Sequence, residues 1–177
     1  DWLAGDGLLE QGDVDADPGT PPHEVDYAAV AAFKRPRLRA AFDRFRRGAA
    51  GDQHAPFAAF VERHRAWLDD YALFEALKAR HDGAAWTDWE PALARRDPAA
   101  IDRARRELAA DVRFHQFVQF QFRRQWHELR RYANERNVRI VGDLPIFVAH
   151  DSADVWSHPE LFRLEPDGRP AVVAGVP

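Results

Sequence analysis

The chain has 177 residues, of which 46% are hydrophobic, 12% aromatic and 31% charged, a composition typical of one globular domain or of one domain with part of another. Its net charge is -4 and it has no cysteine, which excludes disulfides, thiolate catalysis and cysteine metal sites and fits a cytoplasmic protein. No apolar run is long enough to cross a bilayer, so we expect no membrane partner, and the absence of methionine predicts a piece of a longer protein.

The first 26 residues are rich in Gly, Pro and Asp, and we expect an irregular loop there with one turn near Leu8 and Leu9. From Tyr27 onward, apolar residues recur at near-helical spacing, which predicts a helix. Pro36 interrupts that pattern and predicts the start of a new helix.

A second helix is predicted after the break at residues 48–53. Residues 57–77 keep one face apolar and the other charged, and Gly83 is expected to end this helix. The next segment contains Trp86 and Trp89, which we expect to act as packing anchors on the way to the following helix.

Asp97–Pro98 is typical of an N-cap followed by proline at the first helical position. Apolar positions over residues 101–132 predict one long helix that ends between residues 134 and 137. The β-branched run over residues 138–146 predicts a buried strand. A helix followed by a wholly apolar strand indicates a parallel α/β unit, so the expected fold class is mostly α with a short α/β portion.

The tail of the chain has two short β-like runs on either side of a turn. Pro166, Asp167 and Gly168 form that turn signal.

Four acidic residues of the first loop match the ligand spacing of a calcium EF-hand, namely Asp13, Asp15, Asp17 and Glu24. Such a loop needs glycine at its sixth position, where this sequence has Pro18. His150, Asp154 and His158 would align only on one helix, and Pro159 interrupts it. We therefore expect no metal and no cofactor.

Arginines occur in clusters that are also found in nucleic-acid-binding proteins: Arg44, Arg46 and Arg47; Arg103, Arg105 and Arg106; Arg130 and Arg131. Each cluster lies among Glu and Asp at helical spacing, which favours solvated helix faces. We expect no nucleic-acid partner.

Asp143 follows residues 138–142, at or just before the point where the predicted strand emerges. In β/α barrels, functional side chains lie at the carboxyl ends of strands, so this aspartate is placed to bind a substrate hydroxyl or to orient a catalytic group. The alternative is an aspartate that only accepts backbone N–H bonds at a strand end. Ser152 lies between Asp151 and Asp154, and this pattern predicts a helix N-cap, with a ligand contact as the alternative.

The sequence around these residues resembles the 4-α-glucanotransferases, also called amylomaltases or disproportionating enzymes, of the α-amylase superfamily. The resemblance is carried by RIVGDLPIFVAHDSADVWSHPELFRLEPDGRPAVVAGVP, and upstream by VDYAAVAAFKRPRLRAAFDRF, AWLDDYALFEALKARHDGAAW and FVQFQFRRQWHELRRYANERNVRI. It implies a (β/α)₈ barrel with inserted helical subdomains. Residues 1–95 would be a helical inserted subdomain, 96–150 a helix and strand of the barrel, and 151–177 the start of a loop or β subdomain beside the substrate groove.

The activity that the resemblance implies is the transfer of α-1,4-glucan segments between maltooligosaccharides with retention of configuration. Retention needs a carboxylate nucleophile and a second carboxyl group about 5 Å away. The family places its nucleophile in an Arg-Ile-Asp-His context, whereas Arg139–Ile140 is followed here by Val-Gly. We expect neither catalytic carboxylate in this chain, and we expect the chain alone to be inactive.

The resemblance also assigns roles to individual residues. It implies that Asp143 supports the active-site floor, and that substrate contacts come from Asp143, Ser152, Asp154, Trp156 and Gly175. The expected partner is a maltooligosaccharide or α-1,4-glucan. A non-catalytic helical module that binds glycans or proteins is the alternative.

Overall fold

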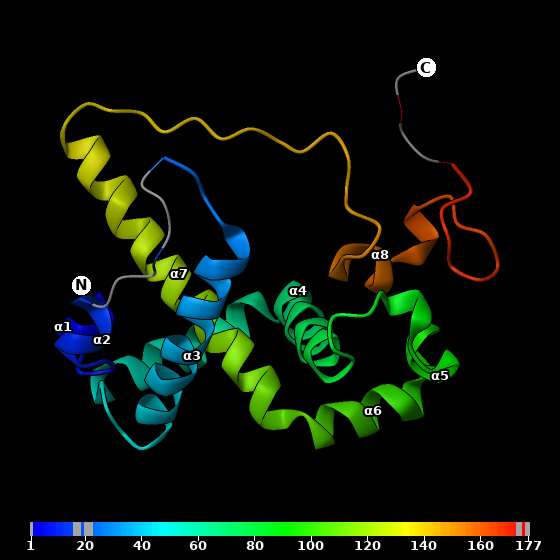
Figure 1. The fold of residues 1–177 in the computed structure, drawn as a ribbon, viewed down its shortest axis with the longest axis horizontal. Helices are drawn as coiled ribbons and strands as arrows, with labels where there is room; N and C mark the ends of the chain where they lie inside the picture. Colours follow the sequence, from blue (N-terminus) through cyan, green and yellow to red (C-terminus); the bar gives the residue numbers. More distant parts are fainter. Residues whose placement is uncertain (1, 16–18, 20–22, 173–174, 176–177) are drawn as a thin grey trace. The chain divides into compact units, whose positions relative to one another are not determined.

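The computed structural model describes residues 2–15, 19, 23–172 and 175. The described part is mostly helical, and its only β pairing is an isolated bridge between Leu164 and Pro170. The chain divides into two compact units, Asp1–Glu62 with Phe117–His127 and Arg63–Gln116 with Glu128–Pro177 (Figure 1). No helix among the described residues is long and apolar enough to span a bilayer.

The first unit begins with two short helices, α1 (Trp2–Gly5) and α2 (Gln11–Asp15), where the composition predicted an irregular loop. The turn at Leu8 and Leu9 is confirmed, and both side chains are buried. The expectation of an irregular loop was wrong because burial of these leucines and distant charge pairs order the segment. Asp17 and Pro18 of the EF-hand comparison lie outside the described residues.

Helix α3 (Tyr27–Arg46) begins where expected, after the Asp26 side chain accepts a bond from the Ala29 N–H. The helix runs through Pro36 without a new start, so that prediction was wrong. A proline removes one backbone N–H bond from the helix. In the same turn the Arg37 guanidinium donates to the Phe33 carbonyl oxygen at 2.9 Å and lies 3.6 Å from the centroid of the Phe33 ring, and these contacts stabilise the turn that contains the proline.

The core of the first unit is a cluster of phenylalanine rings from α3, α4 (His54–Arg80) and α7 (Ala109–Glu135). Phe45 lies 5.4 Å from Phe57 and 5.0 Å from Phe117 between ring centroids, in edge-on and tilted arrangements. Such arrangements are the favoured ones for aromatic pairs. The 3₁₀ turn η1 (Gly51–Gln53) occupies the predicted break before α4.

A polar network lies beside this core. The Arg124 guanidinium donates to Asp6 Oδ2 at 2.8 Å and to Gln53 Oε1 at 2.7 Å, and the Gln121 amide also donates to Gln53 Oε1. Burial acts to raise the pKa of the Asp6 carboxyl, but the bonds from Arg124 and Gln53 and the charge of Arg124 together hold that pKa below 3.8.

In the second unit, two predicted helix boundaries are confirmed. Helix α4 ends at Arg80, and Gly83 follows with a φ of +81° while its N–H bonds the Lys78 carbonyl oxygen at 2.8 Å. Helix α6 (Pro98–Glu107) starts at Pro98 with the Asp97 side chain accepting bonds from two backbone N–H groups.

The single long helix expected after Pro98 is instead two helices. Leu108, with φ -101° and ψ 17°, separates α6 from α7, although no glycine or proline marks the break. The predicted end is confirmed, because α7 stops at Glu135 and Asn137 has a positive φ of 57°.

Residues 138–146 were predicted to be a buried strand, and that prediction was wrong for the structure of this chain. The segment is extended but unpaired, and Val141, Leu144 and Ile146 are 89%, 86% and 88% exposed. A strand needs a neighbour for its backbone groups and a covered face for its apolar side chains, and the described part of the chain provides neither.

The core of the second unit gathers three tryptophans around α4 and α6. Trp86 in η2 (Trp86–Asp88) and Trp89 before α5 (Pro91–Ala94) are both 4% exposed, which confirms them as packing anchors. Trp156 joins them from α8 (Ala153–Ser157), which is followed by the 3₁₀ turn η3 (Pro159–Leu161).

The predicted turn of the tail is confirmed. Gly168 has a φ of +85°, and its N–H bonds the Glu165 carbonyl oxygen at 2.8 Å. The β-like runs around the turn are reduced to the bridge between Leu164 and Pro170.

The Asp6 network generates a pH-dependent prediction. Asp6→Asn should lower the free energy of unfolding at pH 7 by about 1 kcal/mol, the net value of one hydrogen bond. Because the folded-state pKa of Asp6 lies below its ordinary value of 3.8, this stability is present above that value and is lost as the pH falls through the folded-state pKa. Urea unfolding at several pH values should therefore show the two proteins converging in acid. Asp52→Asn, an exposed change in the same unit, is the control; a difference that persists unchanged in acid would contradict the assignment.

Candidate functional site

Asp143 lies in the extended segment after α7 and is exposed to solvent. Its Oδ1 accepts a bond from the Leu144 N–H at 2.8 Å, a local contact. The nearby apolar residues Leu144, Ile146 and Phe147 are exposed as well. Asp143 therefore stands beside an uncovered apolar surface, without a second carboxylate bonded to it.

Asp151 has a structural role that the sequence did not indicate. Its Oδ2 pairs with the Lys78 ammonium at 2.5 Å, and its Oδ1 accepts a bond from the Trp86 N–H at 3.3 Å. Lys78 also donates to the carbonyl oxygens of Gly83 and Ala84. One carboxylate thus ties the approach to α8 to the end of α4, across 73 residues of sequence.

Ser152 is the N-cap of α8, as predicted. Its Oγ accepts a bond from the Val155 N–H at 3.3 Å, and its extended backbone precedes the first helical residue. Asp154 lies in the first turn of this helix, where a carboxylate is favoured by the helix dipole, and its side chain is exposed.

Trp156 projects from α8 into the core and is 1% exposed. Its indole N–H donates to the Leu93 carbonyl oxygen at 3.1 Å, and the Arg96 guanidinium carbon lies 4.3 Å from the ring centroid. This distance is within the range of cation–π attraction. It also accounts for Arg96 Nη1, which is buried without a hydrogen-bond partner.

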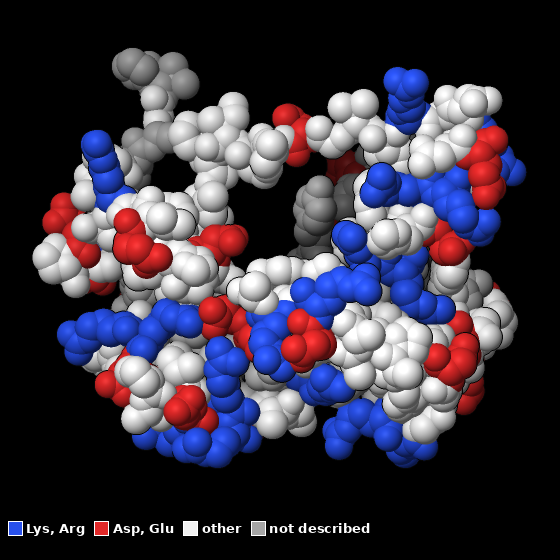
Figure 2. Space-filling model, turned by 180° about the vertical axis from the view of Figure 1, so that it is seen from behind, with Lys and Arg blue, Asp and Glu red and all other residues white. Residues whose placement is uncertain are grey.

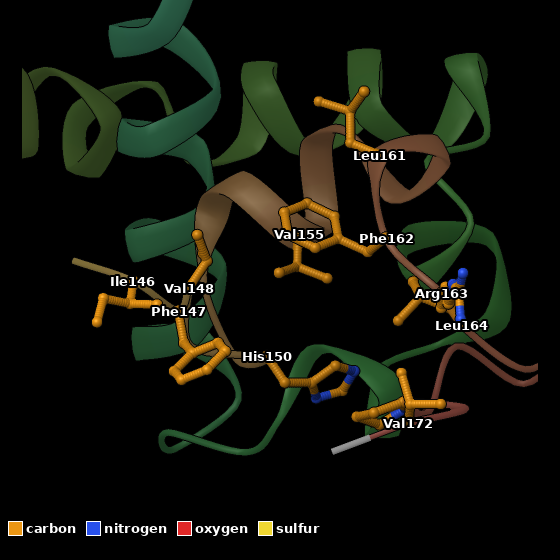
Figure 3. Close-up of a pocket in the computed structure, with 11 residues that line it drawn as sticks. Ile146, Phe147, Val148, His150, Val155, Leu161, Phe162, Arg163, Leu164 and Val172 are labelled. Atoms are coloured by element: carbon orange, nitrogen blue, oxygen red, sulfur yellow. The ribbon is translucent and has the colours of Figure 1, made fainter. Parts of the chain in front are cut away.

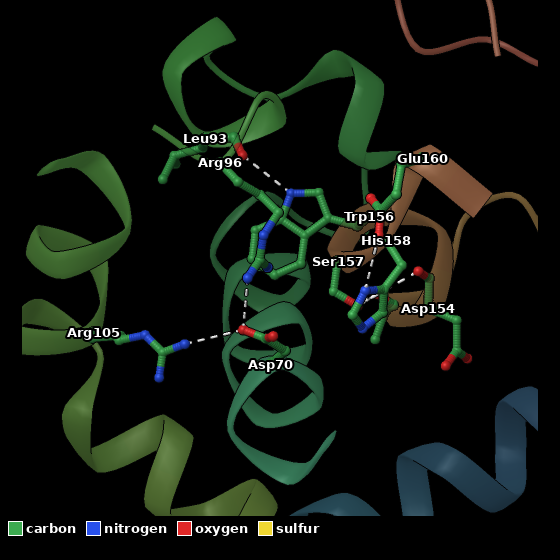
Figure 4. Close-up of polar contacts among 10 residues, drawn as sticks. Asp70, Leu93, Arg96, Arg105, Asp154, Trp156, Ser157, His158 and Glu160 are labelled. Carbon is green, nitrogen blue, oxygen red and sulfur yellow. Dashed lines mark hydrogen bonds and ion pairs between the residues drawn. The ribbon is translucent and has the colours of Figure 1, made fainter. Parts of the chain in front are cut away.

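Asp70 holds that guanidinium in place (Figure 4). Asp70 Oδ1 accepts bonds from Arg96 at 2.8 Å and from Arg105 at 3.0 Å. The sequence singled out neither Asp70 nor Arg96, and it named Arg105 only in a cluster expected to be solvated. The reason is that the two arginines lie 26 and 35 residues from Asp70 and share no local pattern with it.

A largely apolar cavity of about 420 Å³ lies next to α8 (Figure 3). Phe147, His150 and Val155 lie around it, together with residues 161–164 and Val172. His150 Nε2 is 2.8 Å from the Gly168 carbonyl oxygen, which holds the imidazole against the tail. No Asp or Glu is among the residues that line this cavity in the described part of the chain. The arrangement is suited to packing or binding, and it lacks the pair of carboxyl groups that glycosidic cleavage requires.

Gly175 is exposed, and nothing lies within 4 Å of the position that a Cβ atom would take there. The residues that the sequence proposed for a site therefore divide into two groups. Ser152, Asp154 and Trp156 are brought together on α8, whereas Asp143 and Gly175 lie on exposed segments before and after it.

The charged groups of the described residues give little support to an ion site. No group of three or more His, Asp or Glu in that part of the chain is placed to hold a metal. Several clustered arginines are paired with acids, such as Arg44 with Glu10 and Arg131 with Glu128 and Glu135. Figure 2 shows both signs of charge on the face that it draws.

The N-cap generates a stability prediction. Ser152→Ala should lower the free energy of unfolding by about 1 kcal/mol, because the Val155 N–H loses its acceptor while Trp156 ties α8 to the core. Ser152→Asp is the matched control and should retain the wild-type value, since aspartate caps equally well. Urea denaturation followed by tryptophan fluorescence measures both free energies of unfolding. An alanine variant as stable as wild type would show that the Ser152 cap does not stabilise α8.

Comparison with known proteins places this geometry in a family context. The family model described as 4-alpha-glucanotransferase matches residues 2–177. A 4-alpha-glucanotransferase from Thermus thermophilus is 50% identical over 161 residues, which are 91% of this chain and 32% of that protein. One from Synechocystis is 44% identical over 178 residues, or 100% of this chain and 35% of that protein.

A solved structure is similar to this chain in fold as well as in sequence. The amylomaltase from Streptococcus agalactiae in complex with acarbose matches 99% of this chain with a TM-score of 0.91 and 34% identity. The match covers 35% of that structure, so this chain spans about a third of the length of the proteins it resembles.

Proposed function

Because this chain belongs to the 4-alpha-glucanotransferase family, we propose that it is part of an enzyme that transfers α-1,4-glucan segments between maltooligosaccharides. The observation that carries the proposal is the family match over residues 2–177, supported by 50% identity to a curated member. The transfer would proceed by a retaining double displacement, through a covalent glycosyl-enzyme. A cytoplasmic location fits the absence of cysteine.

We further propose that the extended segment at residues 138–146 is a strand of a (β/α)₈ barrel. Its support is physical: the segment has no β partner among the described residues and its large apolar side chains are exposed, which is costly unless other strands pair with it and other elements cover its faces. On this proposal, residues 1–95 are an inserted helical subdomain, residues 96–150 supply one helix and strand, and residues 151–177 begin a subdomain beside the substrate groove.

In such a barrel, Asp143 would stand at or just before the point where its strand emerges on the face where barrel active sites lie. We assign it a supporting role: its carboxylate would accept a hydrogen bond from a substrate hydroxyl or stabilise the positive charge that develops on the reacting sugar. The nucleophile and the acid/base carboxyl would come from parts of the enzyme other than this chain.

The α8 residues would shape the edge of the same groove. Ser152 caps the helix and Trp156 anchors it in the core, so both would act by positioning. Asp154 has an exposed carboxylate, which suits direct contact with sugar hydroxyls. Gly175 has open space around its Cα, which would let a glucan approach the backbone closely.

A first test concerns Asp143 in the full-length enzyme. Asp143→Asn should reduce kcat for maltotriose disproportionation at least tenfold, since a charged acceptor at the reacting sugar is replaced by a neutral one. The thermal unfolding midpoint should change little, because the side chain makes only a local bond in this chain. Exposed Asp167→Asn is the control; normal turnover in the Asp143 variant would leave Asp143 without a role in the reaction.

A second test concerns the chain by itself. The purified 177-residue polypeptide should release no glucose from maltotriose, because a double displacement needs two carboxyl groups that we assign to other parts of the enzyme. Glucose release that follows the polypeptide through purification, and that is lost on its denaturation, would overturn the assignment of the catalytic groups to other parts of the enzyme.

A further inference from the structure

A second cavity lies between α4 and α8, within the second unit, with a volume of about 270 Å³. Ligand pockets for drug-sized molecules occupy roughly 300–1,000 Å³, so this cavity suits one or two sugar-sized rings. Apart from two alanines, its lining combines aromatic, acidic, hydroxyl and imidazole side chains: Trp67, Asp70, Tyr71, Asp154, Ser157 and His158.

Trp67 gives the cavity an accessible aromatic wall. Its side chain is 46% exposed, unlike the buried tryptophans of the core. The indole N–H donates to His64 Nδ1 at 3.3 Å, and the Tyr71 ring lies 6.0 Å away between centroids. These contacts fix the ring, so a flat apolar face is presented to solvent at little entropic cost on binding.

Besides Trp67, the lining of the cavity includes hydrogen-bond acceptors from α4 and α8. Asp70 uses Oδ1 for both arginines, while its Oδ2 has no partner in the part of the chain that the structure describes. The Asp154 carboxylate is exposed, and Ser157 Oγ donates to the Ala153 carbonyl oxygen at 2.6 Å and keeps its lone pairs for accepting. Acceptors of this kind are matched by a ligand rich in O–H donors.

The charges around the cavity favour a neutral ligand over an ionic one. Arg96 and Arg105 neutralise Asp70, which removes the attraction for a cation, and no metal-binding group occurs among the described residues. The exposed carboxylate of Asp154 would repel an anion. A neutral polyhydroxyl compound is what remains, with its C–H face against Trp67 and its hydroxyls toward Asp154 and Asp70 Oδ2.

We propose that this cavity is a sugar-binding pocket that takes one or two glucose units of an α-1,4-glucan. The choice of an α-glucan rests on the proposed function, whereas the preference for a neutral sugar rests on the cavity alone. Contacts in the neighbouring core preorganise the pocket. Trp156 fixes α8 through its bond to the Leu93 carbonyl oxygen and its contact with Arg96, and Arg96 in turn binds Asp70 on α4 (Figure 4).

The test uses the indole N–H signal of Trp67 in the full-length protein labelled with ¹⁵N-tryptophan, assigned by its loss in Trp67→Phe. Titration with maltotriose should shift this signal in a saturable way. Asp154→Ala should raise the dissociation constant read at Trp67 at least tenfold, since a charged acceptor is lost. Asp167→Ala, at an exposed turn outside the pocket, should leave it unchanged.

Unchanged positions of the other indole signals will show that Asp154→Ala is folded. A Trp67 signal that does not respond to maltotriose, that responds equally in Asp154→Ala, or that responds instead to magnesium chloride or sodium phosphate would overturn the proposal. Transfer activity separates the two hypotheses: activity with an unresponsive Trp67 refutes the pocket alone, and a responsive Trp67 without transfer refutes the proposed activity alone.

Discussion

The indole of Trp156 enters the core of the second unit from a helix of only five residues. A helix this short cannot hold itself together, so its position depends on tertiary contacts. The bond to the Leu93 carbonyl oxygen and the Arg96 guanidinium over the ring supply them. The Ser152 cap, the exposed Asp154 and one wall of the sugar pocket all follow from that anchor.

Two carboxylates near α8 have structural partners that account for them without a catalytic role. Asp151 and Asp70 are both carboxylates near α8, yet each is bonded to cationic groups and to backbone or guanidinium donors. Their oxygens are mostly committed to holding elements together. The acidic side chain on α8 that stays exposed is Asp154, which is why both functional proposals use it as a contact.

Much of the helical architecture follows from local sequence signals, because caps and helix ends are local. Asp97–Pro98 and Gly83 set boundaries through their own backbone chemistry, and Ser152 does so through its hydroxyl. The errors arise where distant contacts decide. α3 continues through Pro36, and the leucines before α2 are buried, for reasons that no short window of sequence contains.

The apolar run over residues 138–146 shows most clearly what the sequence alone cannot predict. Its β-branched residues predict a buried strand, and the chain does adopt an extended path there, but burial depends on neighbours. A polar loop would bury no apolar surface against such neighbours. In this segment, side chains such as Val141 and Ile146 are almost fully exposed without them, so neighbouring elements would bury much apolar surface. We therefore infer that this segment belongs to a larger sheet. This is the physical basis of our proposals that Asp143 lies near the floor of a barrel and that the carboxylates that cleave the glycosidic bond belong to other parts of the enzyme.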